Sequence, residues 1–413
     1  MQITFTRIVV PIMGIAFGFF IGCSTLSPSS QKPVQPDELS KQELKVEINS
    51  ANQQISSGKA DADLYYHKGY LLSQYAQKLE NPSDRTATYE ELQTTLQNAE
   101  ELFETANLPS GKQKVDELLK VTWSSEHNLG VQIMQSDSTL ETDDYEKAAV
   151  HFKNATRVLP DTAISYKMEA RAYYKNGKNR QALNVLEEAN MEIESLPAEM
   201  LEQLAFLYLE TGQSSKAVQI YEDAETVFSS DNLNVIHGLA NAYISSGNHV
   251  KAVSLLNELV ENEPDNIIYA QTLATEYFYL GTKKLSEITE ETPKDIRTQE
   301  LLEDADSLFS RARRQLESSL SRNSGNRELQ ESFVSFYQNA AAKYQSVLSE
   351  VSESEKSEIK EIIRDYLSSS IPVYETLVQQ YPEASQNYWK NLYEVYSYLG
   401  MSEKAQEAKS KFN

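Results

Sequence analysis

A pattern of small residues, tyrosines and glycines repeats three times in the middle of the chain and constrains the fold more than any other feature. Its small residues lie 35 positions apart, at Ala170, Ala205 and Ala240. In each copy a tyrosine follows three positions later, a glycine seven positions later and a second alanine twelve positions later. Residues three and seven positions apart share one face of a helix, and glycine commonly ends a helix in the left-handed conformation. The pattern therefore predicts pairs of antiparallel helices, in which the small residue permits close approach and the tyrosine fills the space beside it.

This pattern resembles the tetratricopeptide repeat, whose signature W-x2-L-G-x2-Y, A-x3-F and P extends over about 34 residues. The best match comes last: Trp389, Leu392, Tyr393, Tyr396 and Gly400, followed by Ala405. In the three middle copies alanine replaces the first glycine of the signature, and aliphatic residues or tyrosine replace the tryptophan. Weaker copies flank them, so the resemblance covers roughly residues 60–412. It implies an all-α fold, a right-handed superhelix (α-solenoid) of about eight antiparallel helix pairs that are stable only as a stack.

Two adjacent copies are longer than the others. The small residue of the first helix normally precedes that of the second by 12 positions, but Ala274 precedes Ala312 by 38 and Phe333 precedes Ser370 by 37. The inserted sequence is helical in character, so we expect two lengthened hairpins with turns near Thr292-Pro293 and 352–357. Each helix would gain about 13 residues, or roughly 20 Å, and together they would form a four-helix arm. The alternative is two unrelated insertions, one of them broken at Pro372.

The N-terminus has the features of an export signal. Arg7 precedes an almost uninterrupted apolar run over 8–21. This run is too short for a membrane-spanning helix, which needs about 20 residues, but it suits the core of a secretory signal. The run ends at Gly22-Cys23-Ser24, which resembles the lipobox of bacterial lipoproteins, although Phe20 stands where leucine is usual. The resemblance implies that the chain is cleaved before Cys23, which then carries lipid, including palmitate. The alternative is an uncleaved anchor with a buried thiol.

The lipoprotein resemblance implies a location in the cell envelope, and Ser24 favours the outer membrane, on its periplasmic or surface side, if the host has two membranes. After Cys23 the chain is rich in serine and proline as far as Ser40 and cannot pack a core, so a flexible tether is expected.

The sequence divides into six predicted segments. They are a signal peptide (1–22), the lipid-bearing cysteine and tether with a segment that can cap the array (23–60), irregular helix pairs (61–160), the regular array (161–281), the lengthened hairpins (282–382), and a final repeat with a capping helix (383–413).

Composition excludes several classes of function. The chain has 413 residues, with 38 Lys+Arg against 61 Asp+Glu, for a net charge of −23; such an acidic chain is a poor candidate for nucleic-acid binding. A single cysteine excludes an internal disulfide and a zinc site built on cysteines. The five histidines are scattered, and no phosphate-binding, dinucleotide-binding or hydrolase motif is present. We therefore expect no catalytic residues, no cofactor and no metal, although an envelope hydrolase that uses some of the many carboxylates stays open.

The family resemblance implies a concave face that is lined by the first helices and holds an extended or helical segment of a partner protein. Helical spacing from the packing residues assigns twelve residues to this groove: Lys167, Arg171, Tyr174, Glu202, Phe206, Leu209, His237, Asn241, Ile244, Gln271, Thr275 and Phe278. The alternative is that some of these side chains only fill the contacts between neighbouring first helices.

We therefore expect a lipid-anchored adaptor or scaffold of the cell envelope, with protein partners and a place in an outer-membrane or secretion-related assembly. The alternative is a surface lipoprotein that captures glycans or other nutrients. Such binders need exposed flat aromatic rings, and the chain has only two tryptophans, Trp123 and Trp389.

Overall fold

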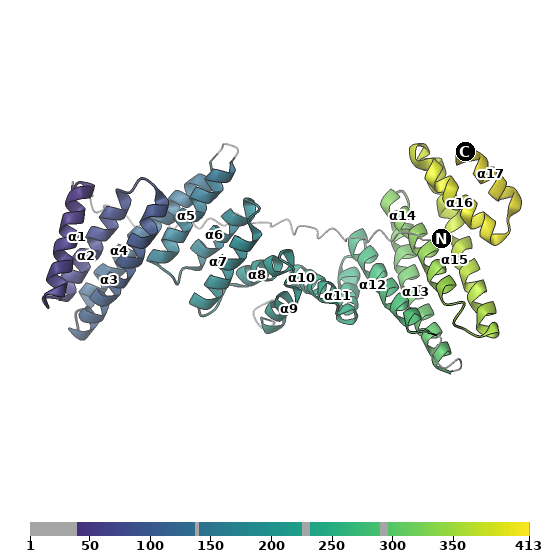
Figure 1. Cartoon of the computed structure of the whole chain (residues 1–413), viewed down its shortest axis with the longest axis horizontal. Coiled ribbons are helices and arrows are strands. Elements are labelled where there is room, and N and C mark those ends of the chain that lie inside the picture. Colours follow the sequence, from purple (N-terminus) through teal and green to yellow (C-terminus); the bar gives the residue numbers. More distant parts are fainter. Residues whose placement is uncertain (1–38, 137–139, 225–231, 290–295, 413) are drawn as a thin grey trace. The chain divides into compact units, whose positions relative to one another are not determined.

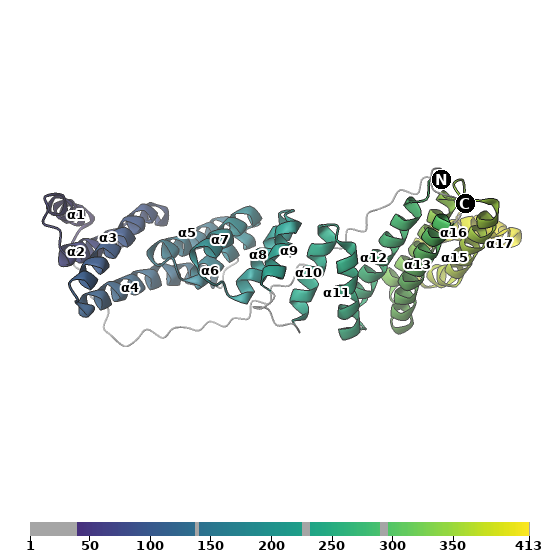
Figure 2. The same ribbon diagram turned by 90° about the horizontal axis from the view of Figure 1, so that it is seen from below.

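The computed structural model describes residues 39–136, 140–224, 232–289 and 296–412, and these residues contain seventeen α-helices, two short 3-10 helices and no strand. They divide into two compact units, one up to residue 224 and one from residue 232 onward. The N-terminal unit holds α1 to α9 and the C-terminal unit holds α10 to α17. Within each unit, consecutive helices run in alternating directions side by side (Figure 1, Figure 2). The all-α fold of stacked helix pairs is thus confirmed.

The helices of the N-terminal unit are α1 (Lys41–Ser56), α2 (Ala62–Gln77), α3 (Thr86–Thr105), α4 (Pro109–Met134), α5 (Thr142–Val158), α6 (Ala163–Lys175), α7 (Asn179–Glu192), α8 (Ala198–Glu210) and α9 (Ser214–Asp223). The first 3-10 helix, Pro82–Arg85, joins α2 to α3. Those of the C-terminal unit are α10 (Leu233–Ser245), α11 (His249–Asn262), α12 (Ile267–Ser286), α13 (Ile296–Arg322), α14 (Arg327–Ser346), α15 (Glu353–Gln380), α16 (Ser385–Leu399) and α17 (Ser402–Phe412).

From α2 onward the described helices form eight pairs, each made of an even-numbered first helix and the odd-numbered second helix that follows it. Helix α1 precedes them and buries Leu44 and Ile48 in the same apolar cluster as α2 and α3, so a capping helix lies where the sequence predicted one. In the C-terminal unit a single apolar core runs from Ile236 of α10 to Ala408 of α17.

The repeated glycines and small residues act as predicted. Gly177, Gly212, Gly247 and Gly400 each follow a first helix with φ between +70° and +80°, a conformation that glycine adopts without strain. A small residue permits close approach where the pairs are irregular as well. A Cβ atom added to Gly130 would lie 2.8 Å from the ring of Phe152 in α5, and one added to Gly281 would lie 2.8 Å from the ring of Phe309 in α13.

In several pairs the repeated tyrosine joins the pair to the one before it. The hydroxyl of Tyr208 donates to Glu187 Oε1 of the preceding pair at 2.8 Å, and the Nζ atom of Lys216 lies 5.0 Å from the centre of the Tyr208 ring. Lys216 also forms an ion pair with Glu187 at 3.2 Å. Tyr208 thus lies between a carboxylate 21 positions before it and a lysine 8 positions after it, and its ring is packed while its hydroxyl stays polar.

The C-terminal unit repeats this arrangement with the same spacing. Tyr396 donates to Glu375 at 2.8 Å, and Lys404 lies 5.4 Å from the ring centre and 3.6 Å from Glu375. Tyr337 and Tyr277 make related contacts, to Glu317 and Asn257.

The two lengthened hairpins are present. Helices α12 and α14 each have 20 residues and α13 and α15 have 27 and 28, compared with 13 and 14 in α10 and α11. The second helices therefore gain the predicted length, whereas the first helices gain only about half of it. Helix α15 continues through Pro372 rather than breaking there. The boundary that we predicted between 281 and 282 falls inside α12.

The added turns of the two hairpins pack against each other. The ring of Tyr344 lies 5.6 Å from that of Phe309 and 6.0 Å from that of Tyr366, and Arg313 forms an ion pair with Asp365 at 2.9 Å. The predicted turn at Thr292-Pro293 lies outside the described residues. The predicted turn at 352–357 is wrong, because Ser352 and Glu355 form a capping box that starts α15, so the chain turns before it, over 347–352.

We predict that Tyr208→Phe lowers the free energy of unfolding of the N-terminal unit by about 1–2 kcal/mol, because the hydrogen bond to a carboxylate is lost while the ring stays in place. Urea unfolding, monitored by hydrogen exchange of the α8 amides, measures the change. The matched control is Tyr398→Phe, because Tyr398 is 43% exposed. Loss of its hydroxyl should cost less than about 0.5 kcal/mol. Equal effects of the two substitutions would contradict the role assigned to Tyr208.

Candidate functional site: the first-helix faces and two buried carboxylates

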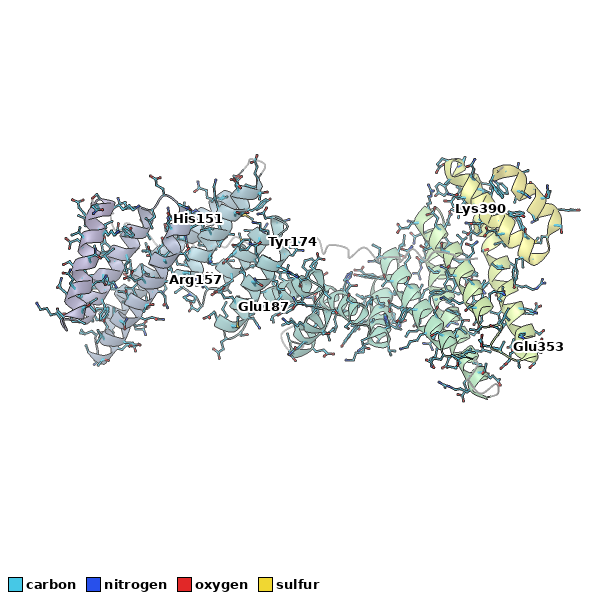
Figure 3. The ribbon with its side chains drawn as sticks, viewed as in Figure 1. His151, Arg157, Tyr174, Glu187, Glu353 and Lys390 are labelled. Carbon is cyan, nitrogen blue, oxygen red and sulfur yellow. The ribbon has the colours of Figure 1, made fainter. Side chains whose placement is uncertain are left out.

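Six of the predicted groove residues lie in the N-terminal unit, on α6 and α8. Lys167 of α6 forms an ion pair with Glu199 of α8. The rings of Tyr174 and Phe206 meet edge to face with centroids 5.7 Å apart (Tyr174 is labelled in Figure 3). Phe206 is only 3% exposed, which corrects the prediction for this residue: Phe206 fills the space between neighbouring first helices. The other five, Lys167, Arg171, Tyr174, Glu202 and Leu209, are half-buried and form the N-terminal first-helix face.

A shallow, open hollow of about 450 Å³ lies beside this face, where the turn from α6 to α7 meets the end of α8. It is lined by the start of α7, including Lys178 and Arg180, and by Glu210 and Thr211. The amide of Asn179 donates to Glu210 Oε2 at 3.3 Å, and Lys178 is ion-paired with Glu146. The sequence pattern did not predict the hollow, because the repeat signature does not constrain turn side chains.

The other six predicted residues lie in the C-terminal unit, on α10 and α12: His237, Asn241, Ile244, Gln271, Thr275 and Phe278, all half-buried. His237 Nδ1 lies 3.1 Å from the hydroxyl of Tyr269, and Gln271 Nε2 donates to Ser332 Oγ at 2.9 Å. The ring of Phe278 packs between those of Phe309 and Phe336, at 5.3 and 6.0 Å. These residues, with the neighbouring positions of α14, form the C-terminal first-helix face.

Two polar side chains of this second face, His237 and Thr275, carry no charge at pH 7. Burial lowers the pKa of His237, against the opposing charge of Glu263, so the imidazole is neutral at pH 7. The hydroxyl of Thr275 donates to the backbone carbonyl of Gln271 in its own helix at 2.8 Å.

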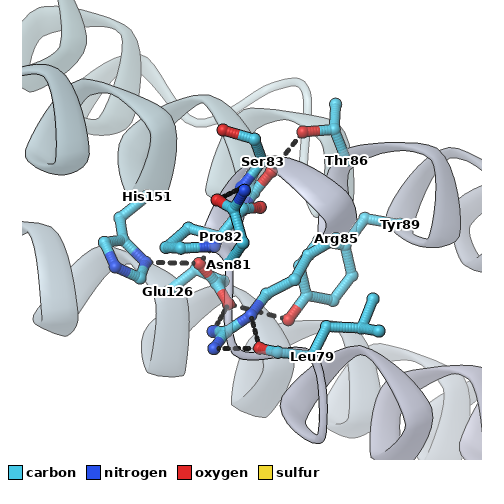
Figure 4. Close-up of polar contacts among 10 residues, drawn as sticks. Leu79, Asn81, Pro82, Ser83, Arg85, Thr86, Tyr89, Glu126 and His151 are labelled. Carbon is cyan, nitrogen blue, oxygen red and sulfur yellow. Dashed lines mark hydrogen bonds and ion pairs between the residues drawn. The ribbon is translucent and has the colours of Figure 1, made fainter.

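A buried polar centre surrounds Glu126 of α4 (Figure 4). Its carboxylate accepts hydrogen bonds from Arg85 Nη1, the hydroxyl of Tyr89 and Nδ1 of His151, each at 2.8 Å. Asn154 donates to it at 3.3 Å and to the carbonyl of Pro82 at 2.9 Å. Burial opposes ionisation of Glu126, but the bonds from His151 and Arg85 outweigh it and hold the pKa of Glu126 below its usual value.

The geometry gives this centre a structural role. Glu126 is fully buried, and Arg85 also donates to the carbonyl of Leu79. The centre thereby fixes the 3-10 helix Pro82–Arg85 against α3, α4 and α5, and a buried pair of this kind costs about 3–5 kcal/mol when one partner is removed. The repeat pattern did not predict this centre, although the sequence contains a signal for it: Glu126 lies four positions before Gly130, where the repeat signature has tryptophan.

A second buried carboxylate lies on α6. Glu169 occupies the position directly before Ala170, where the signature has leucine, and it is almost completely buried. Burial and the nearby charge of Glu188 raise its pKa to about 8, against the smaller opposing effects of Lys153 and Arg157. Arg157 itself donates to Glu188 at 2.6 Å (Arg157 is labelled in Figure 3). At neutral pH Glu169 is therefore mostly protonated.

Within the described ranges no group of histidine, cysteine and acidic residues is arranged to hold a metal ion. Likewise, none of the helices there is long and apolar enough to span a membrane. Cys23 and the predicted signal peptide lie outside the described residues.

We predict that Glu169→Gln stabilises the N-terminal unit at neutral and alkaline pH. Because the folded pKa of Glu169 lies above its unfolded value of 4.5, the wild type loses stability as pH rises from 4.5 to about 8. The variant should match the wild type near pH 4 and exceed it by a few kcal/mol at pH 9, since each tenfold change in an ionisation constant corresponds to about 1.4 kcal/mol. Urea unfolding across this range measures the difference. Glu194→Gln, in the exposed loop after α7, is the control; a pH-independent gain in both variants would contradict the assignment.

The comparisons with known proteins agree with the repeat pattern. Residues 208–277 match the family model described as a tetratricopeptide repeat. A search of curated proteins found no match.

Several solved structures are similar to the chain. One is the C-terminal part of a tetratricopeptide repeat-containing protein from Cytophaga hutchinsonii, with 13% identity over 70% of this chain and 93% of that one and a TM-score of 0.43. A second is a tetratricopeptide repeat protein from Parabacteroides merdae, with 17% identity, 68% and 98% coverage and a TM-score of 0.32. A third is YrrB, described as a TPR protein with an unusual peptide-binding site, with 14% identity, 45% and 88% coverage and a TM-score of 0.31.

The repeated alanine, tyrosine and glycine positions, the helix pairs that they form and the match over 208–277 lead to one conclusion. The chain is a protein that contains tetratricopeptide repeats.

Proposed function

We propose that the chain is a lipid-anchored adaptor of the cell envelope that binds protein partners on its first-helix faces. The observation that carries this proposal is the placement of the predicted residues: eleven of the twelve are half-buried on α6, α8, α10 and α12. Half-buried side chains on consecutive helices suit recognition, because part of each side chain is packed and the rest can contact a partner.

A stack of helix pairs suits such a role. Within one unit, neighbouring first helices present equivalent positions side by side, so that one extended segment can contact several of them. The tyrosine contacts between pairs hold these positions in place before a partner arrives, and a preorganised surface loses less conformational entropy on binding. Glu126 and Glu169 are buried away from solvent and provide no basis for a catalytic role.

The anchor completes the proposal. Cys23 would carry lipid after cleavage at Gly22, and the serine- and proline-rich residues 24–40 would link it to α1. A flexible tether of this length has a root-mean-square span of roughly 20–25 Å, so the folded part could reach partners near the membrane. From there it would recruit partners within an outer-membrane or secretion-related assembly.

One observation favours a second candidate, the capture of glycans. Tyr279 of α12 and Tyr398 of α16 are 46% and 43% exposed. Exposed aromatic rings can stack on sugars, and both residues lie on first helices of the C-terminal unit. Retention of a neutral oligosaccharide in the absence of a protein partner would support this candidate over the adaptor.

Cys23→Ala should abolish incorporation of labelled palmitate in a bacterial host and shift the protein from the membrane fraction to the soluble fraction, because lipidation requires the thiol. Ser24→Ala is the matched control and should keep the label. Membrane retention and labelling of Cys23→Ala at the wild-type level would contradict the proposed anchor.

A photoreactive amino acid on a first helix should crosslink a partner in cells. Ile164 at the start of α6 and Asn241 in α10 are suitable positions, and Met191, which is 77% exposed near the end of second helix α7, is the control. Mass spectrometry should identify the same partner from 164 or 241 and not from 191. A partner that crosslinks only from 191 would show that the first-helix faces are the wrong surface.

A further inference from the structure

The two buried carboxylates of the N-terminal unit differ in their hydrogen bonds. The carboxylate of Glu126 accepts hydrogen bonds at 2.8 Å from Arg85, Tyr89 and His151. Glu169 is 5% exposed, and among the residues that the structure describes none donates a hydrogen bond to its carboxylate. An ionised carboxylate without donors is costly to bury, so a group in this setting keeps its proton. The closed packing around Glu169 therefore requires the protonated form.

The cations that face Glu169 from α5, Lys153 and Arg157, do not offset its burial. Arg157 forms an ion pair with Glu188 of α7 at 2.6 Å and lies 3.4 Å from Glu90 of α3. Burial raises the pKa of Glu169 most and the charge of Glu188 raises it further, while Lys153 and Arg157 each oppose this with a smaller effect. An ionised Glu169 would therefore lie in the core beside a second anion.

Two tyrosines of α6 lie next to Glu169, one turn before it and one turn after it. Tyr166 is 1% exposed, and its hydroxyl has no hydrogen-bond partner. Burial raises the pKa of Tyr166, and the charges of Glu188 and Glu192 raise it further. Burial likewise raises the pKa of Tyr173, with added effects of Glu169 and of Glu146 on α5. Both tyrosines therefore keep their protons up to pH 9 and bring no counter-charge to Glu169.

Helix α6 also carries part of the N-terminal first-helix face. On that side Lys167 forms an ion pair with Glu199 of α8, and the ring of Tyr174 contacts that of Phe206. The helix has 13 residues and packs chiefly against α5 and α7. A helix of this length depends on tertiary contacts for its stability. Loss of the contacts around Glu169 would therefore release the face as well.

We infer that loss of the Glu169 proton opens the contact of α6 with α5 and α7, so that the N-terminal first-helix face is closed while Glu169 is protonated and opens as pH rises. Once opened, the carboxylate is solvated and has its ordinary pKa of 4.5, whereas in the closed helix pair its pKa is about 8. Opening therefore becomes about tenfold more favourable per pH unit between these two values and constant above them.

The opening ends at α5. The bonds of Glu126 hold α3, α4 and α5 together, and because they lower the pKa of Glu126 its carboxylate stays ionised throughout this pH range. Such a boundary makes α6 a local unit that opens without unfolding of the whole stack. The opening concerns the protein alone, while its effect on a partner rests on the proposed function.

The test compares native-state hydrogen exchange of the full-length wild type and Glu169→Gln at the same pH, from pH 5 to 9, so that the pH dependence of chemical exchange cancels. For the α6 amides, the ratio of the wild-type rate to the variant rate should rise about tenfold per pH unit between pH 5 and 7 and level off above pH 8. For the α2 and α3 amides the ratio should change less than twofold. Glu169→Leu, which restores the leucine of the repeat signature, is a second variant and should give the same ratios.

A substitution on α7 separates an electrostatic effect from a purely structural one. Glu188→Gln removes the anion beside Glu169 and frees Arg157 to pair with the ionised carboxylate. Measured in this background, the α6 ratio at pH 8 should be at least tenfold smaller than in the wild-type background. Glu194→Gln, in the exposed loop after α7, is the matched control and should change the ratio less than twofold.

The effect on a partner is measured by photocrosslinking from position 164 of α6 in cell extracts buffered at pH 6 or 9. The yield of the wild type should fall at least threefold at pH 9, because the face opens. The yield of Glu169→Gln should be the same at both values within 1.5-fold.

An α6 ratio that does not change with pH would overturn the inference. An equal rise of the ratio in α2 and α3 would also overturn it, because the whole unit would then unfold instead of α6 alone. The expected exchange with equal crosslinking of the wild type at both pH values would refute the effect on a partner. The expected exchange without any crosslink from position 164 would refute the proposed function of this face and leave the opening of α6 standing.

Discussion

Every helix pair in this protein depends on burial by its neighbours. One amphipathic pair leaves an apolar side uncovered, and only the next pair in the stack covers it. The repeated tyrosines sit at these junctions: Tyr208 and Tyr396 are packed through their rings and donate their hydroxyls to Glu187 and Glu375 of the preceding pair. Close approach at small residues such as Gly130 and Gly281 makes each pair compact enough for this contact. The first-helix faces result from this stacking, because only the side of a pair that packs against no other pair stays open to solvent.

The two faces carry different chemistry on the same scaffold. In the N-terminal unit, charge lies both on the surface and within the core, where Glu126 is satisfied by Arg85 and His151 while Glu169 is held mostly protonated. In the C-terminal unit the first helices α10 and α12 carry almost no exposed charge, and the charged residues lie on α13 instead.

Much of the fold follows from local sequence. The alanine and glycine positions define α6 to α11 because each acts within one helix pair. The spacing between Ala274 and Ala312 likewise predicts the long α13. The sequence-based prediction was wrong where one residue can take two structural roles. Ser352 could begin a turn or cap a helix, and only its contact with Glu355 shows that it caps α15. The burial of Phe206 could not be predicted, because it depends on Tyr174 of the neighbouring pair. The partners of Glu126 come from positions 41 and 25 residues away, so only the tertiary structure brings them together. The 35-residue register also continues from Ala205 to Ala240 across the boundary between the units, so the pattern carries no sign of that division.

Hydrogen–deuterium exchange of the full chain, alone and bound to its crosslinked partner, tests most directly whether the first-helix faces are where partners bind. If partners bind there, exchange slows in the first helices of one unit, either α6 and α8 or α10, α12 and α14. Exchange in second helices such as α7, α11 and α13 stays unchanged. Protection confined to the second helices would contradict it.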